Sequence, residues 1–160
     1  MKFTVSLCLF FLFFQINAQE NWTLEKDQEG IKVYTRHKKG FVIKEFKAIT
    51  YTSKSISELE EILEDVENYP MWFYRVSSGK LIKELGNDRT LYYSLDLPWP
   101  VSDRDIVIQS VKSKDNGLRY DMTATQGGYP DQSGLVRMTS AFGSWQFIPK
   151  DGKIEIIRFW

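Results

Sequence analysis

The residues of this chain that could take part in acid–base chemistry gather just before an apolar run. Asp103, Arg104 and Asp105 stand side by side ahead of Ile106. Alternation along a strand would point both carboxylates to one face, as in a pair of catalytic acids. The arginine between them would keep both ionised, whereas a general acid must hold a proton. The sequence therefore predicts that Arg104 and Asp105 form either a polar anchor for a ligand or a structural clamp.

The rest of the sequence gives little support for a metal site or a catalytic nucleophile. His37 is the only histidine and Cys8 the only cysteine, while zinc sites and catalytic triads bring several such side chains together. His37 stands in the basic run Arg36-His37-Lys38-Lys39, which is typical of a solvated hairpin tip. We expect no catalytic residue, no metal site and no cofactor.

A second feature that could take part in binding is the glycine pair ahead of Tyr129-Pro130. Gly127 and Gly128 lack the strand, loop and helix pattern that surrounds a phosphate-binding loop. The sequence instead predicts a flexible loop at Gly127, Gly128 and Tyr129.

The first 18 residues predict an export signal. Lys2 precedes an uncharged, Phe- and Leu-rich run from Phe3 to Phe14, which is shorter than the roughly 20 residues of a membrane-spanning helix. A small residue, Ala18, predicts cleavage after position 18, and an uncleaved anchor is the alternative. The exported protein, periplasmic or secreted, would have no cysteine and a net charge of −1 in place of 0, so we expect no nucleic-acid partner.

Residues 19–160 predict one α+β domain, because no repeat or linker interrupts them. Ser55 to Glu58 matches a capping box, and the apolar residues from Ile56 to Val66 recur at helical spacing. Beyond Trp72 the pattern alternates, with Leu91, Tyr93 and Leu95 on one face of a strand. Turn residues at 86–88, 115–117 and 151–152 join neighbouring strands into an antiparallel meander. The helix and the sheet must bury their apolar faces against each other, but the pattern leaves open whether the space between them is filled or hollow.

The run Leu97-Pro98-Trp99-Pro100-Val101-Ser102-Asp103-Arg104-Asp105-Ile106-Val107 resembles a segment of the START (StAR-related lipid-transfer) domain family. Segments 30–34, 63–72, 124–130, 134–138 and 143–145 fit the same template in the same order. The resemblance covers nearly all of residues 22–160. It implies a helix-grip fold, in which a curved antiparallel β-sheet and an amphipathic helix enclose an elongated cavity for one apolar molecule.

The resemblance also implies which partner and side chains to expect. The partner would be a lipid or another apolar small molecule, with transient contact to a membrane. Gly127, Gly128 and Tyr129 would form a flexible loop at the mouth of the cavity. The cavity would be lined by inward-facing strand residues: Leu91, Tyr93, Leu95, Ile106, Ile108, Tyr120, Met122, Val136, Met138, Trp145 and Phe147.

Two departures from the family pattern bear on these expectations. Ser110 stands where sterol-binding and phosphatidylcholine-binding relatives carry an arginine, so their head-group contact is not carried over. The sequence also stops at Ile157-Arg158-Phe159-Trp160, inside a strand-like run, where the family continues to a long closing helix. We therefore expect a C-terminally incomplete domain without its closing helix, with an uncovered apolar sheet face and an unpaired strand edge.

The leading hypothesis from the sequence is a lipid carrier or lipid sensor that holds one apolar ligand. One alternative is a helix-grip enzyme of the cyclase or hydrolase type, which would need an acid, base or metal site in the cavity. The other is an interaction module whose cavity is filled by side chains. The sequence leaves the ligand and the oligomeric state open.

Overall fold

A computed structural model describes residues 21–160, so the predicted signal peptide lies outside the described residues. Its elements are ten strands, one α-helix and one 3-10 helix. The strands are β1 (Thr23–Gln28), β2 (Ile31–Arg36), β3 (Glu45–Thr52), β4 (Val76–Leu85), β5 (Asp88–Leu95), β6 (Arg104–Ser113), β7 (Leu118–Ala124), β8 (Val136–Met138), β9 (Phe142–Lys150) and β10 (Lys153–Phe159). The helices are α1 (Ile56–Glu64) and η1 (Val66–Met71), and no helix of this part of the chain is long and apolar enough to span a membrane.

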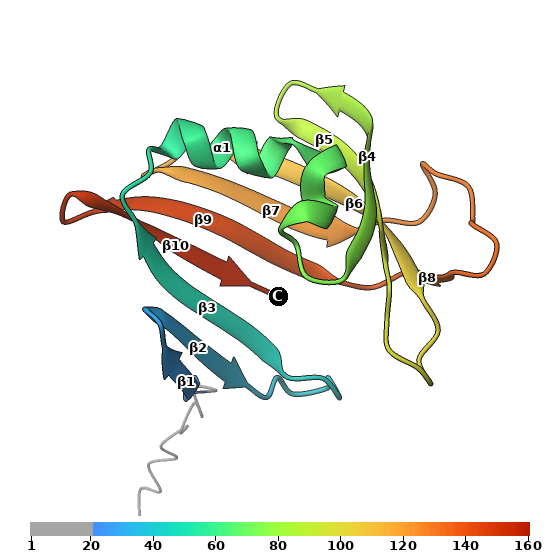
Figure 1. Cartoon of the computed structure of the whole chain (residues 1–160), viewed down its shortest axis with the longest axis horizontal. Helices are drawn as coiled ribbons and strands as arrows, with labels where there is room; N and C mark the ends of the chain where they lie inside the picture. The colour runs from blue at the N-terminus through green and yellow to red at the C-terminus, as the bar shows by residue number, and fades with distance from the viewer. Residues whose placement is uncertain (1–20) are drawn as a thin grey trace, which may run out of the picture.

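The strands form one sheet in the order β1-β2-β3-β10-β9-β7-β6-β5-β4, with β8 paired in parallel to β6 off this path (Figure 1). The other pairings are antiparallel, which confirms the predicted fold class. The expectation of an unpaired edge at the last strand is wrong. Strand β10 pairs with β9 on one side and with β3 on the other, so β1 and β4 are the sheet edges. The β3 partner comes from the other end of the sequence, and local patterns do not reveal such a pairing.

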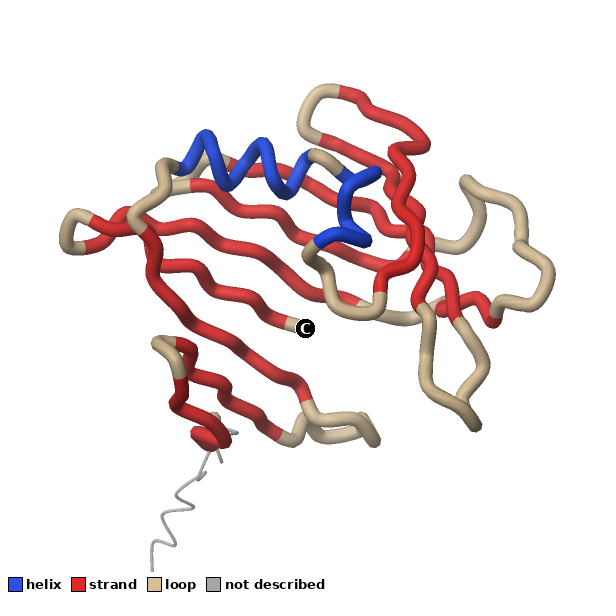
Figure 2. The backbone as a smooth tube through the Cα atoms, viewed as in Figure 1, coloured by secondary structure: helices blue, strands red, loops and turns tan. Residues whose placement is uncertain are grey.

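The predicted capping box begins α1. The Ser55 hydroxyl accepts a hydrogen bond from the Glu58 amide, and the Ser55 amide donates to the Glu58 carboxylate at 2.8 Å. The α-helix ends at Glu64, a few residues before Pro70, and η1 carries the chain on with that proline inside it. Figure 2 shows both helical segments lying over one face of the sheet.

The core lies between α1, η1 and the sheet. On the helical side, Leu59, Leu63, Val66 and Tyr69 are all buried. On the sheet side they meet the inward side chains of the central strands: Leu91, Tyr93, Ile106, Ile108, Leu118, Tyr120, Met122 and Phe147. Burial of this apolar surface supplies the main stabilisation of the domain.

A polar network at the end of α1 fixes the helix to the sheet. Lys112 Nζ lies 3.0 Å from Glu60 Oε1 and 2.7 Å from Glu64 Oε1, and the Tyr120 hydroxyl donates to the same Glu64 oxygen at 2.8 Å. Arg89 Nη2 donates to the Glu64 carbonyl at 2.9 Å. Burial raises the pKa of Glu64, but the hydrogen bonds from Lys112 and Tyr120 outweigh it and hold that pKa below its usual value.

The sheet bends where its strand pairing is irregular. The register of β4 against β5 shifts between Val76 and Ser78 and again between Leu81 and Lys83, and such bulges increase strand bend and twist. Gly79 on β4 lies so close to η1 that a Cβ atom there would be 2.0 Å from the Val66 carbonyl oxygen. The curved strands and this close approach leave a concave face that α1 and η1 only partly cover.

Candidate ligand pocket

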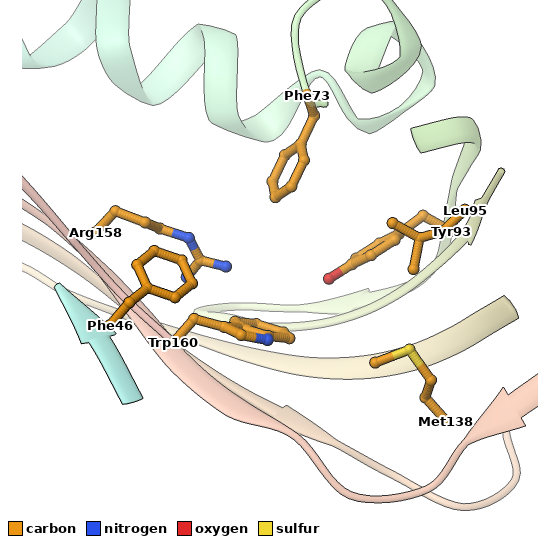
Figure 3. Close-up of a pocket in the computed structure, with 7 residues that line it drawn as sticks. All are labelled: Phe46, Phe73, Tyr93, Leu95, Met138, Arg158 and Trp160. Carbon is orange, nitrogen blue, oxygen red and sulfur yellow. The ribbon is translucent and has the colours of Figure 1, made fainter. Parts of the chain in front are cut away.

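Two adjoining hollows open on the concave face beside the core. The first has a volume of about 190 Å³ and is lined by Phe46, Phe73, Tyr93, Leu95, Met138, Arg158 and Trp160 (Figure 3). The second, of about 260 Å³, is lined by Phe46, Trp72, Phe73, Tyr74, Trp145 and Arg158. Each alone is smaller than the roughly 300–1,000 Å³ of typical small-molecule sites. Because they share Phe46, Phe73 and Arg158, we describe them as one open pocket.

Strand ends that are distant in sequence bring the lining residues together. The amide of Phe46, on β3, donates to the Trp160 carbonyl at 2.9 Å, and the Trp160 amide donates back at 3.1 Å. Phe73 follows η1 directly, while Tyr93 and Leu95 lie at the end of β5. The pocket is therefore built at one end of the sheet from side chains of both halves of the domain.

Gly143 on β9 makes room for two of these side chains. A Cβ atom at this position would lie 2.4 Å from Trp160 Cε3 and 3.1 Å from Arg158 Nη1. Any larger residue would have to displace the Trp160 ring, so the bare backbone lets this part of the pocket wall lie flat against β9.

Among residues 21–160, Arg158 is the one charged residue that lines the pocket. It shares the inward face of β10 with Ile154 and Ile156 and is only 9% exposed. Its Nη1 donates to the carbonyls of Ser144, at 3.3 Å, and Phe159, at 2.9 Å.

The guanidinium of Arg158 also lies against two aromatic rings. Its carbon is 4.9 Å from the centre of the Trp145 ring and 4.5 Å from that of Trp160. Burial lowers its pKa to about 10, although the nearby Tyr93 and Tyr69 oppose the shift. The side chain therefore stays protonated at neutral pH.

Aromatic rings make up most of the remaining wall. The Phe73 ring lies 6.1 Å from Tyr93 and 6.4 Å from Trp145, and Trp72 lies 6.3 Å from Trp145. Burial raises the pKa of Tyr93 to about 12, and its hydroxyl points into the same space as the Arg158 guanidinium (Figure 3). The Nε1 atom of Trp145 is buried without a hydrogen-bond partner.

The structure places four of the eleven predicted lining residues at the pocket. Tyr93, Leu95 and Met138 line the first hollow, and Trp145 lines the second. Six others are buried in the core against the helices: Leu91, Ile106, Ile108, Tyr120, Met122 and Phe147. Val136 is 45% exposed on β8. Alternation identifies the inward face of each strand but does not show which part of that face α1 covers.

The predicted mouth loop lies away from the pocket. The ring of Tyr129 packs at 4.2 Å from that of Tyr92, on the opposite face of β5 from Tyr93. A Cβ atom on Gly128 would approach Val107, which also points to the outer face. Gly127, Gly128 and Tyr129 thus cover the convex side of the sheet, and the expectation that they border the cavity is corrected.

Asp105 belongs to a clamp that holds this outer loop. It is 1% exposed, and both of its carboxylate oxygens accept hydrogen bonds from Arg137, from Nε and Nη2, each at 2.9 Å. Arg137 also donates to the carbonyls of Tyr129, at 3.2 Å, and Pro130, at 3.1 Å. The partner of Asp105 is therefore Arg137 and not the adjacent Arg104, whose side chain makes no hydrogen bond or ion pair within residues 21–160.

No group of three or more His, Cys, Asp or Glu side chains in the described part of the chain is placed to hold a metal ion. His37 is exposed between β2 and β3.

The fold and the pocket define a helix-grip domain, and sequence comparison gives its family. The sequence model of the START domain matches residues 16–142. A protein of Pseudomonas aeruginosa described as uncharacterized is 32% identical over 142 residues, which are 88% of this chain and 70% of that protein. The chain belongs to the START domain family and is a lipid-binding domain.

Solved structures agree with this assignment. A STAR-related lipid transfer protein from Xanthomonas axonopodis, solved as the fragment 25–204, superposes with a TM-score of 0.81 at 28% identity, over 87% of this chain and 80% of that one. Human StAR-related lipid transfer protein 5 superposes with a TM-score of 0.73 at 17% identity, over 87% and 70% of the two chains, and at that identity shows the shared fold alone.

Proposed function

We propose that the domain holds one hydrophobic ligand in the pocket beside its core, as a lipid carrier or lipid sensor. The observation that carries the proposal is an open hollow walled by Phe46, Phe73, Leu95 and Met138 on the concave face. Apolar surface that leaves water for such a wall is stabilised by roughly 25 cal/mol per Å². Shape and apolar area, more than specific polar contacts, would supply the affinity.

Two adjoining hollows argue against the alternative of an interaction module with a filled cavity. Catalysis is not part of the proposal. The polar side chains that Figure 3 shows in the pocket are Arg158 and Tyr93, with pKa values of about 10 and 12. Both stay protonated at neutral pH, so neither suits general-base chemistry there.

Transient contact with a membrane is a further part of the proposal. The β2–β3 loop just before Phe46 exposes Val42 by 98% and Ile43 by 83%, and the loop after Leu95 exposes Trp99 by 92%. Figure 1 places both loops on the lower side of the view. Exposed apolar side chains on loops at one side of a molecule are typical of surfaces that meet lipid, and a ligand could exchange there without crossing water.

We also propose that the protein is exported with cleavage after Ala18. Mass spectrometry of the protein recovered from its expressing host should give a mature N-terminus at Gln19. A mass that includes Met1 to Ala18 would contradict the cleavage.

Displacement of an environment-sensitive fluorescent fatty acid tests ligand binding. A Leu95→Trp variant should fill the first hollow and weaken probe binding at least tenfold. The matched control is Val111→Trp, which adds the same ring to a β6 side chain that is 43% exposed, and it should bind the probe as the wild type does. Equal binding by both variants, or no binding by the wild-type protein, would overturn the proposal.

A further inference from the structure

The pocket contains unused hydrogen-bond donors and few acceptors. A guanidinium carries five N–H donors and no acceptor. In Arg158, the hydrogen bonds to the Ser144 and Phe159 carbonyls both come from Nη1. Nε and Nη2 have no protein acceptor within the described residues, and the Nε1 donor of Trp145 has none either. The Arg158 donors belong to the wall of the pocket, whereas Trp145 Nε1 is buried behind it.

No carboxylate within residues 21–160 forms an ion pair with Arg158, although the side chain is 9% exposed. Burying an unpaired charge is costly, and proteins usually supply a counter-charge. This chain does so for Arg137, whose side chain is 14% exposed and pairs with the buried Asp105. Arg89, whose side chain is 6% exposed, also has a carboxylate nearby, with its Nε 3.8 Å from Glu84 Oε2. The contrast with Arg158 indicates that the partner of Arg158 is not one of the described side chains.

The surroundings of Arg158 fit a ligand with a distinct head and tail. Its guanidinium points into the first hollow, opposite Leu95 and Met138 and below Phe73 (Figure 3). The guanidinium carbon lies 4.9 Å from the centre of the Trp145 ring and 4.5 Å from that of Trp160, and the unused Nε and Nη2 donors lie on one edge of the group, which suits a two-oxygen anion. The facing wall offers only apolar side chains and the Tyr93 hydroxyl.

We propose that the ligand is an amphiphile whose anionic head group, a carboxylate or a phosphate, binds Arg158 while its apolar tail lies against Phe73, Leu95 and Met138. The inference rests on the proposed function, because it names the chemical class of ligand for the same pocket. It assigns Arg158 as a specificity-determining residue on β10, a strand on which the sequence analysis placed no site.

Binding of three probes with one chain length tests the inference: hexadecanol, hexadecanoate and hexadecyl phosphate, each measured by displacement of the fluorescent fatty acid at pH 7. A charge-assisted hydrogen bond to a buried group should favour the anions by roughly tenfold or more. The stronger of the two anions identifies a carboxylate or a phosphate as the preferred head group. Equal affinity for all three probes would overturn the inference while leaving the proposed function standing, whereas no binding of any probe would overturn both.

Variants of Arg158 separate its charge from its bulk. Arg158→Gln should lose the preference for anions and keep the affinity for hexadecanol, and Arg158→Lys should keep part of the preference. The control is Arg119→Gln, which removes an exposed arginine from β7 and should leave all three affinities unchanged. An Arg158→Gln protein that still prefers the anions would refute the assignment. If the Arg158→Gln protein fails to fold, the affinities of the wild-type protein for the three probes are sufficient to support or overturn the inference.

Discussion

Neutralising Asp105 should destabilise the domain strongly, because its partner would remain buried and charged. The side chains of Arg137 and Asp105 are 14% and 1% exposed. Removing one partner of a buried ion pair typically costs about 3–5 kcal/mol. Arg137 keeps its hydrogen bonds to the Tyr129 and Pro130 carbonyls. We therefore expect Asp105→Asn to lower the free energy of unfolding by about 3 kcal/mol, the lower end of that range.

A second Arg–Asp pair in the same chain provides the control. Arg119 and Asp121 also form two hydrogen bonds, but their side chains are 42% and 53% exposed. Exposed pairs contribute about 0–1 kcal/mol, so Asp121→Asn should change stability by less than about 1 kcal/mol.

The assay is urea denaturation followed by far-UV circular dichroism at pH 7, with the free energy of unfolding compared at equal m-values. Replacing both partners, as Asp105→Leu with Arg137→Met, should recover much of the loss, because no buried charge is then left alone. A cost for Asp105→Asn within about 1 kcal/mol of the Asp121→Asn value would refute the reasoning.

Three further predictions concern the core, the polar network and the loop. Leu63→Ala should cost about 2–5 kcal/mol in urea denaturation, because its side chain is 3% exposed against the sheet, and a cost below about 1 kcal/mol would contradict that packing. The pKa of Glu64 is lower in the folded state than in the unfolded state, so the ionised carboxylate stabilises the fold at neutral pH, and this stabilisation is lost as the pH falls and the carboxylate is protonated. Glu64→Gln should therefore reduce the drop in urea midpoint between pH 7 and pH 3. An unchanged drop would count against the network with Lys112 and Tyr120. Val42→Asp should weaken cosedimentation with anionic vesicles and leave binding of the fatty-acid probe in solution intact; undiminished cosedimentation would refute the loop's role.

Local signals in the sequence predicted the elements of the fold well. The capping box at Ser55 and Glu58 determines the start of α1 because it satisfies two backbone amides that the helix itself leaves without a partner. Turn residues at 86–88, 115–117 and 151–152 do join consecutive strands, since a tight hairpin leaves only neighbours to pair.

Contacts between distant segments were not readable from the same patterns. The pairing of β3 with β10, and that of Asp105 with Arg137, join residues that no local spacing connects. Arg158 was missed as a site residue, although one signal was present. Arg158 stands two and four positions after Ile156 and Ile154, so it lies on the same inward face of the strand, where a charged residue is costly. A polar residue at a predicted core position is the pattern that marks a functional site.

Native mass spectrometry of the purified protein tests the central claim most directly. If the concave face holds a guest, gentle ionisation should show the chain with one additional lipid-sized mass, and organic extraction should release that molecule in a one-to-one ratio. The Leu95→Trp protein should lose the added mass, and the Val111→Trp protein should retain it. A wild-type protein that carries no added mass, and takes up none after incubation with hexadecanoate, would contradict the account.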